Sequence, residues 1–308
     1  MATPRPALVK DLTWRLEAVG FDLFSGLVRL LPVDAASALG AAVFRTFGPL
    51  SGAHRTARRG LRLAFPDMAE ANRAAILVAQ WENFGRYIFE FPLVDRLTPD
   101  SGRVEIVNPE RLASIAAGAS PAVLISGHFA NLEIMAAVIM AAGIECEITY
   151  RAANNPYVNA RIIKSRESYG VRLFARKGRD GARDLMYALR AGRSIAILND
   201  QRYDAGIPTP FFGRTVITNP VAARMAIKFD TIIQPLSIQR LTGARFRCIA
   251  HEPIIPPKTS DRSADIQTVM NEITAFIEAR VREAPGAWWW MHRRWPPADY
   301  EALKAQGL

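Results

Sequence analysis

Short apolar stretches and helix-forming stretches alternate along residues 103–198, and this alternation limits the possible folds more than any other feature. Each expected strand is separated from the next by a helix. The expected strands are Val104–Val107, Ala122–Ser126, Ile144–Tyr150, Val171–Ala175 and Ser194–Leu198. Strands that alternate with helices usually form a parallel or mixed sheet with helices on both faces. We therefore predict an α/β fold with a mixed, mostly parallel sheet flanked by helices.

The most informative motif follows the strand Ala122–Ser126. A histidine, His128, lies in the turn after this strand, and Glu133 follows five residues later. If Asn131 is the N-cap of the next helix, His128 precedes that helix and can fold back over its first turn, where Glu133 lies. An imidazole oriented by a carboxylate can take a proton from a hydroxyl group. The alternative is a turn histidine with no chemical role.

The wording of this motif, GHFANLE from Gly127 to Glu133, resembles the signature of the lipid A late acyltransferases. These lauroyl and myristoyl transferases belong to the wider lysophospholipid-acyltransferase-like group. The resemblance continues in the family's order and covers most of the chain from about Trp81 onward. Its further blocks are Tyr150 and Arg151, Asn154 to Pro156, Asp200 and Gln201, Pro210 to Gly213, and Trp290 to Arg294.

The resemblance implies transfer of a fatty acyl chain from an acyl carrier protein thioester to a hydroxyl group of a lipid A precursor, with no further cofactor. It implies that His128 is the general base and that Glu133 is its orienting carboxylate. Backbone N–H groups near Gly127, or the side chain of Arg151, are candidate donors to the oxyanion.

Five other residues are candidates for binding the acceptor. Arg151, Arg166 and Arg214 suit phosphates or sugar acids, because the guanidinium fork matches phosphate geometry; each equally suits a surface ion pair. Asp200 and Gln201 form a further candidate block, in which Asp200 is expected to anchor an arginine or a sugar hydroxyl. His128, Arg151 and Asp200 each directly follow an expected strand, so we expect them at one edge of the sheet.

The charge of the chain indicates acidic partners. The formal net charge is +10, which suits an acyl carrier protein, a phosphorylated glycolipid or an anionic membrane surface. We expect no nucleic-acid partner. Two cysteines, Cys146 and Cys248, are too few for a disulfide framework. The four histidines show no metal-ligand spacing, so no metal is expected.

The organisation predicted from these patterns is an N-terminal helical membrane-associating region, residues 1–66, followed by an acyltransferase domain, residues 67–308. The helix expected at Leu12–Leu31 carries one narrow polar stripe of Arg15, Asp22 and Arg29 on an apolar cylinder. These charges disfavour a spanning helix. A helix in the membrane surface and a helix packed on the protein's own core remain open. The resemblance implies the cytoplasmic face of the bacterial inner membrane, with peripheral or monotopic attachment.

Several aromatic and basic clusters allow two interpretations. Residues 202–219 are expected to form an ordered loop over the site, in which Phe211 and Phe212 either wall an acyl channel or contact lipid, or instead pack in the core. Four tryptophans in residues 288–295 suit either a membrane interface or core packing. The basic cluster suits either lipid phosphates or a solvated helix face; it consists of His54, Arg55, Arg58, Arg59 and Arg62. The aromatics of the helix Ala69–Phe89 are expected in the core.

Three functions fit the sequence. The first is a lipid A late acyltransferase. The second keeps the same chemistry on another membrane acceptor, such as a phosphatidylinositol mannoside or an aminolipid. The third is a basic, non-enzymatic membrane or nucleic-acid binder, which accounts for the charge but not for the ordered motifs.

Overall fold

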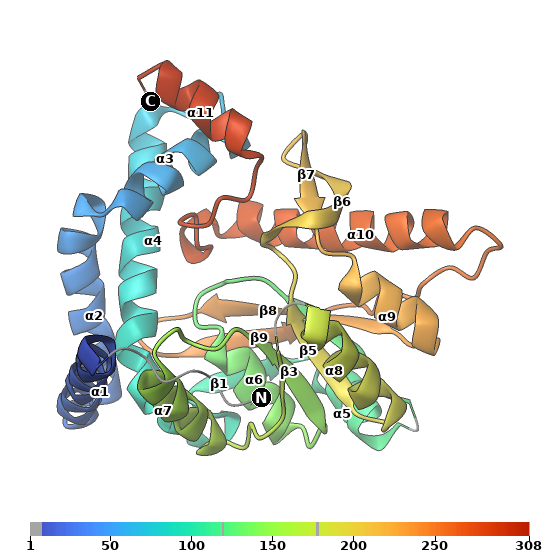
Figure 1. Ribbon diagram of the computed structural model, residues 1–308, viewed down its shortest axis with the longest axis horizontal. Helices are drawn as coiled ribbons and strands as arrows, with labels where there is room; N and C mark the ends of the chain where they lie inside the picture. The colour runs from blue at the N-terminus through green and yellow to red at the C-terminus, as the bar shows by residue number, and fades with distance from the viewer. Residues whose placement is uncertain (1–7, 119, 177–178, 308) are drawn as a thin grey trace.

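A seven-stranded sheet forms the centre of the protein in the computed structural model, which describes residues 8–118, 120–176 and 179–307 (Figure 1). The strand order is β1-β9-β8-β2-β5-β3-β4, and only the β8–β9 pair is antiparallel. The strands are β1 (Val104–Val107), β2 (Val123–Ser126), β3 (Cys146–Tyr150), β4 (Phe174–Arg176), β5 (Ser194–Leu198), β8 (Ile233–Arg240) and β9 (Phe246–Ala250). The mixed, mostly parallel α/β sheet expected from the sequence is therefore confirmed.

Alternate side chains of β2 point to opposite faces of this sheet, as the two-residue period of a strand requires. Val123 and Ile125 join one apolar cluster, and Leu124 joins the other. The first cluster is covered by α8 (Arg179–Arg190), α9 (Val221–Phe229) and α10 (Arg262–Glu283), and the second by α5 (Pro109–Ala117) and α6 (Glu133–Ala141). β2 is buried on both faces, which accounts for its three consecutive apolar residues, Val123 to Ile125.

The N-terminal part consists of α1 (Leu8–Arg29), α2 (Val33–Phe47), a short 3₁₀ helix η1 (Gly48–Leu50), α3 (Gly52–Ala64) and α4 (Glu70–Glu90). In Figure 1, α2 and α4 run alongside each other. Gly40 and Gly85 permit this approach, because a Cβ added to Gly40 would lie 2.3 Å from the Gly85 carbonyl oxygen. No helix within the described residues has the length and hydropathy needed to cross a membrane.

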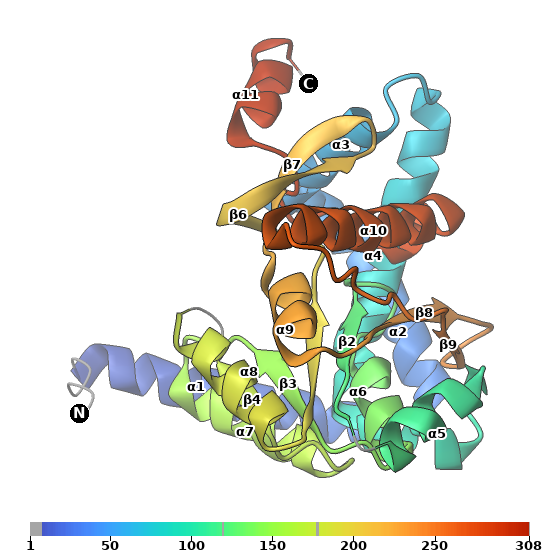
Figure 2. The same cartoon turned by 90° about the vertical axis from the view of Figure 1, so that its right-hand side faces the viewer.

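Residues 202–218 correct one prediction. They form a hairpin, β6 (Arg202–Phe211) and β7 (Arg214–Thr218), instead of a loop. The pattern misled because Gly206, Pro208 and Pro210 interrupt β6 and Gly213 follows it in the turn. Figure 2 shows α10 between this hairpin and α9, which in turn covers the sheet. Phe211 and Phe212 are buried at 0% and 6% exposure, so they pack in the core and do not contact lipid.

The C-terminal tryptophans also lie in the core. Trp288, Trp290 and Trp295 are at most 1% exposed, and Trp289 is 8% exposed. Phe211 packs against both Trp288 and Trp295. The membrane-interface interpretation of this cluster is therefore wrong. The segment after α10 instead fastens the hairpin and α3 to the rest of the protein; the last short helix is α11 (Pro297–Ala305).

Candidate active site

His128 and Asp200 lie in contact at the carboxyl ends of two neighbouring strands. His128 follows β2 and Asp200 follows β5, and these two strands are paired in parallel. One Asp200 carboxylate oxygen lies 2.7 Å from the His128 Nδ1 atom. The other accepts a hydrogen bond from the His128 backbone N–H at 2.7 Å. The expectation that these two residues meet at one edge of the sheet is confirmed.

Asp200 is fully enclosed and remains ionised. Its second carboxylate oxygen also accepts a hydrogen bond from the Trp288 indole at 2.7 Å. Burial alone would raise the pKa of Asp200, but the charge and hydrogen bonds of His128, together with the Trp288 donor, outweigh burial and lower that pKa. A carboxylate only accepts, so the His128 Nδ1 carries the proton. In the neutral imidazole, Nε2 then carries the lone pair that a general base needs.

Gln201 and a second histidine lie beside that lone pair. The Gln201 amide nitrogen lies 3.3 Å from the His128 Nε2 atom and 3.3 Å from the His292 Nε2 atom. The two imidazole rings are 5.0 Å apart between centroids. An amide nitrogen has two hydrogens, so it can donate one to each ring. Arg294 donates a hydrogen bond to the backbone oxygen of Gln201 at 3.2 Å, which helps to hold Gln201 in place.

Glu133 does not orient His128, which corrects the expected dyad. Its carboxylate forms a two-point ion pair with Arg166 at 2.6 and 2.9 Å and accepts a hydrogen bond from the Tyr169 hydroxyl. Arg166 belongs to α7 (Pro156–Glu167), and Glu133 is the first residue of α6. Burial lowers the pKa of Arg166, but the adjacent Glu133 carboxylate outweighs burial and raises it. The acidic residue of the motif therefore joins two helices.

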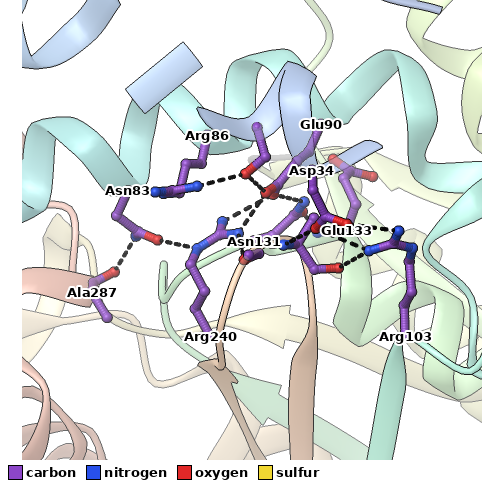
Figure 3. Close-up of polar contacts among 12 residues, drawn as sticks. Asp34, Asn83, Arg86, Glu90, Arg103, Asn131, Glu133, Arg240 and Ala287 are labelled. Carbon is purple, nitrogen blue, oxygen red and sulfur yellow. Dashed lines mark hydrogen bonds and ion pairs between the residues drawn. The ribbon is translucent and has the colours of Figure 1, made fainter. Parts of the chain in front are cut away.

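The turn between His128 and Glu133 is held by a buried polar network (Figure 3). Asn131 accepts from the Glu133 backbone N–H at 3.1 Å, and its amide donates to Glu90 at 2.9 Å. Glu90, which is 0% exposed, also forms an ion pair with Arg240 of β8. The network thus ties the turn to α4 on one side and to the sheet on the other.

The backbone of this turn has an unusual conformation. Ala130 has a φ of 47°, in the left-handed region that favours glycine. Its N–H donates to the carbonyl oxygen of Ala287 at 2.9 Å, and the same oxygen accepts from the Asn83 amide. The N–H of Phe129 bonds to the Gly127 oxygen. The N–H groups of His128, Phe129 and Ala130 therefore all have protein partners. Oxyanion donors near Gly127 stay a prediction.

The predicted arginines do not gather around His128. Arg166 is committed to Glu133 and is mostly buried. Arg151 is exposed and donates to Asn154 at 3.4 Å. Arg214 lies on the β6–β7 hairpin and lines a separate surface pocket beside Gln267 of α10. The structure therefore brings together only Asp200 and Gln201 of the five residues proposed to bind the acceptor.

A pocket of about 400 Å³ opens beside Gln201, at the carboxyl ends of β3 and β5. Its lining includes Asn199, Arg202 and Arg224. Asn199 is 3% exposed, and neither polar atom of its amide has a hydrogen-bond partner within the part of the chain that the structure describes. An unpaired buried amide costs free energy. A polar ligand in this pocket would remove that cost.

Sequence reasoning missed Trp288 and His292 as parts of the site. His292 lies in the block Trp290 to Arg294, and the resemblance of that block to the family was the signal that could have found it. Trp288 lies just before this block, among tryptophans that the sequence does not distinguish from core residues. Within residues 8–118, 120–176 and 179–307, no three His, Cys, Asp or Glu side chains are grouped so that they could hold a metal ion.

Three comparisons identify proteins that are similar to this chain. The profile of a family described as bacterial lipid A biosynthesis acyltransferase matches residues 20–296. The lipid A biosynthesis lauroyltransferase of Escherichia coli (strain K12) is 22% identical over 245 residues, which make up 77% of this chain and 76% of that protein. A solved structure, the 1-acyl-sn-glycerophosphate (LPA) acyltransferase from Thermotoga maritima, covers 80% of this chain and 96% of its own, with 13% identity and a TM-score of 0.36.

Proposed function

Since the chain belongs to the family of bacterial lipid A biosynthesis acyltransferases, we propose that it transfers a fatty acyl group from an acyl carrier protein thioester to a hydroxyl group of a phosphorylated glycolipid, a lipid A precursor. The observation that carries this proposal is the contact between His128 and Asp200, 2.7 Å, which leaves the Nε2 atom of His128 as an oriented base. No cofactor is required, because a thioester is already activated for attack by an alkoxide.

The chemistry requires one base that acts twice. His128 Nε2 takes the proton of the acceptor hydroxyl as its oxygen attacks the thioester carbonyl carbon. The tetrahedral intermediate collapses with cleavage of the carbon–sulfur bond, and the carrier thiolate leaves. The imidazolium, stabilised by the Asp200 carboxylate, then returns the proton to that sulfur. The Gln201 amide nitrogen lies 3.3 Å from the His128 Nε2 atom, and we assign it the role of holding the reacting oxygen atoms.

The 400 Å³ pocket beside Gln201 is the proposed site of the polar part of the acceptor. Its unpaired Asn199 amide suits a sugar hydroxyl, and its Arg202 and Arg224 suit a phosphate group. Neither Arg151 nor Arg214 forms a hydrogen bond or ion pair with His128 or Asp200 among the residues that the structure describes. We therefore propose that these two arginines contact only those groups of the acceptor that lie farther from the reacting atoms.

Helix α1 is the proposed membrane contact. Two of its polar residues bond to the region of α7: Asp22 accepts from Arg161, and Glu17 accepts from Asn155. Its exposed apolar residues have exposures of 52% to 89%; they are Leu8, Val9, Leu12, Leu16, Val19, Leu23 and Leu27, and Leu30 directly after the helix is 80% exposed. An apolar stripe of this kind suits a helix that lies in the membrane surface. We propose peripheral attachment at the cytoplasmic face of the bacterial inner membrane, where the positive charge of the chain meets anionic lipid.

The test is acyl transfer from acyl carrier protein to a tetra-acylated, Kdo-bearing lipid A precursor, read by mass spectrometry. The unaltered protein is expected to add one acyl chain, and the His128→Ala variant is expected to add none while remaining folded. The control is His251→Gln, which removes a histidine that bonds to Ser237, away from this site. Transfer by His128→Ala at the unaltered rate would exclude the proposed base.

Two other results would redirect the proposal. Transfer to a phosphatidylinositol mannoside or an aminolipid, but not to the lipid A precursor, would keep the base and change the acceptor. Salt-dependent binding to anionic vesicles or nucleic acid with no transfer to any acceptor would instead identify a binding protein.

A further inference from the structure

A second pocket, of about 330 Å³, lies between the N-terminal helices and the C-terminal segment. Val43 and Phe44 of α2, Phe84 of α4, and Met291 supply much of its wall. The two side chains of the lining that carry N–H or O–H groups are already paired within the protein. The Trp81 indole donates to the His54 ring, and the Ser51 hydroxyl donates to the Gly48 oxygen. The wall therefore offers a ligand apolar surface and no free side-chain donor.

This pocket is one layer of side chains away from the proposed base. The Trp289 ring packs against Phe84 at 5.1 Å between centroids and against His128 at 5.3 Å. Met291 is the chain neighbour of His292, whose ring lies 5.0 Å from that of His128. The base also borders the polar pocket through Gln201. The reacting centre thus adjoins the polar pocket through Gln201 and the apolar pocket through Trp289.

We propose that the apolar pocket between α2, α4 and Met291 binds a fatty acyl chain during transfer. The inference rests on the proposed function, because a lipid acyltransferase must hold alkyl chains close to its base. An alkyl chain removes apolar surface from water and requires no hydrogen-bond partner, which matches this wall. The mouth suits such a ligand as well, since Phe47 is 63% exposed at the pocket and the adjoining Leu50 is 79% exposed.

The other cavities suit an alkyl chain less well. The apolar cavity beside Glu133 and Arg166 holds only about 50 Å³. The pocket beside Gln201 is large enough, but two arginines and an unpaired amide line it, and burying these groups against an alkyl chain is unfavourable. The apolar chain could belong to the thioester donor or to the acylated acceptor, and both carry the same chemistry.

The first test narrows the pocket and measures chain-length preference. Val43→Phe places a larger side chain in the wall, and Ala53→Leu does the same from α3. The matched control is Ala42→Phe, at the neighbouring exposed position of α2, which is outside the lining. For the two pocket variants, kcat/KM with the longest chains is expected to fall about tenfold relative to the shortest, as expected for overpacking.

Two series of substrates identify the source of the chain. In one series the donor varies from octanoyl to hexadecanoyl carrier protein with a fixed acceptor, and in the other the acceptor chains vary with a fixed donor. If kcat/KM of the pocket variants falls with longer chains in the first series, the pocket binds the donor chain. If it falls with longer chains in the second series, the pocket binds a chain of the acceptor. Both support the proposal. If the pocket variants keep the length profile of the unaltered protein in both series, the proposal is wrong.

A labelling experiment tests the pocket without relying on transfer. The full chain is irradiated with dodecanoic acid that carries a terminal diazirine, and the adducts are mapped by mass spectrometry. Adducts are expected within residues 43–53, 81–84 or at Met291, and Val43→Phe is expected to reduce them while Ala42→Phe does not. Adducts only at other positions would overturn the proposal. Because labelling needs no acceptor, failure of lipid A acylation and failure of the pocket give different results.

Discussion

Asp200 holds His128 at two points, because one carboxylate oxygen bonds to the ring Nδ1 atom and the other to the backbone N–H, both at 2.7 Å. The imidazole therefore keeps one tautomer and one position relative to the sheet edge. Trp288 fixes the carboxylate in turn. This pairing makes Asp200 the residue whose replacement should most directly test the proposed base.

Asp200→Asn is expected to lower kcat by about four orders of magnitude, the loss seen when an amide replaces the carboxylate of a related histidine pair. An amide can donate to Nδ1, which moves the imidazole proton to Nε2 and removes the lone pair. The measurement is single-turnover acyl transfer. Asp230→Asn, which alters an exposed ion pair with Lys258, is the control. Equal rates for both variants would show that Asp200 does not orient the base.

Glu133→Gln is expected to destabilise the protein by about 3–5 kcal/mol, because it leaves the buried Arg166 without its counter-charge. The measurement is urea unfolding. In the double variant Glu133→Gln with Arg166→Met, the loss should be smaller than the sum of the two single losses. If Glu133→Gln kept full stability and lost only activity, Glu133 would have a direct role at the base after all.

Gly127→Ala is expected to disturb the site with a cost of about 1–3 kcal/mol in stability, the usual range for overpacking. An added Cβ would lie 2.6 Å from a Phe129 ring carbon and 3.1 Å from an Asp200 carboxylate oxygen. The expected result is a loss of kcat together with a lower unfolding midpoint. Gly26→Ala provides the contrast, because an added Cβ there meets nothing within 4 Å. Normal kcat in Gly127→Ala would argue against a tightly packed Asp200.

Replacing Leu16, Leu23 and Leu27 together by Gln should remove vesicle binding and leave the fold intact. These side chains are 63% to 66% exposed, so each replacement should change stability by less than about 0.5 kcal/mol. Each leucine that enters lipid should otherwise contribute about 1.5–3 kcal/mol to membrane binding. Co-sedimentation with phosphatidylethanolamine and phosphatidylglycerol vesicles measures the effect, with Leu241→Gln on the β8–β9 turn as control. Undiminished sedimentation would exclude α1 as the contact.

His251 should make the fold sensitive to mild acid. Burial, together with the nearby Arg280 and Arg111, lowers the pKa of His251 to about 4 from the ordinary 6.5. Between these values the unfolded chain takes up a proton that the folded protein does not, so stability should fall as the pH drops from about 6.5 to about 4. Unfolding midpoints at about pH 7 and about pH 5 should differ less in His251→Gln than in the unaltered protein. The same pH dependence in both would contradict this assignment.

The sequence predicted the sheet and pointed to His128 as the candidate base, but it did not predict that Asp200 is the carboxylate in contact with it. Periodicity shows which residues form β2 and β5, and the rule for parallel strands brings His128 and Asp200 to the same edge. Periodicity does not show that β2 and β5 are direct neighbours. That pairing depends on long-range packing, and it decides which carboxylate reaches the imidazole.

Glu133, the acidic residue nearer to His128 in the sequence, was wrongly predicted as its partner for a local reason. The spacing argument placed the helix start at Asn131, but α6 begins at Glu133 and its side chain is buried against α7. Likewise, the apolar residues of α1 gave two interpretations, because sequence does not show whether a leucine stripe faces the core or the outside. The exposures of the leucines of this stripe, 60% to 89%, show that it faces outward. They depend on long-range contacts such as the ion pair of Asp22 with Arg161, which joins residues 139 positions apart.

The contacts of the C-terminal segment determine when the site is completed during synthesis of the chain. His128 and Asp200 are synthesised well before Trp288, which donates to Asp200, and before Arg294, which holds Gln201. A nascent chain that has produced the strands but not this segment therefore has the base without its supports. The proposed base is therefore held by all of its contacts only after Trp288 and Arg294 have been synthesised and the aromatic residues of this segment have packed against the hairpin.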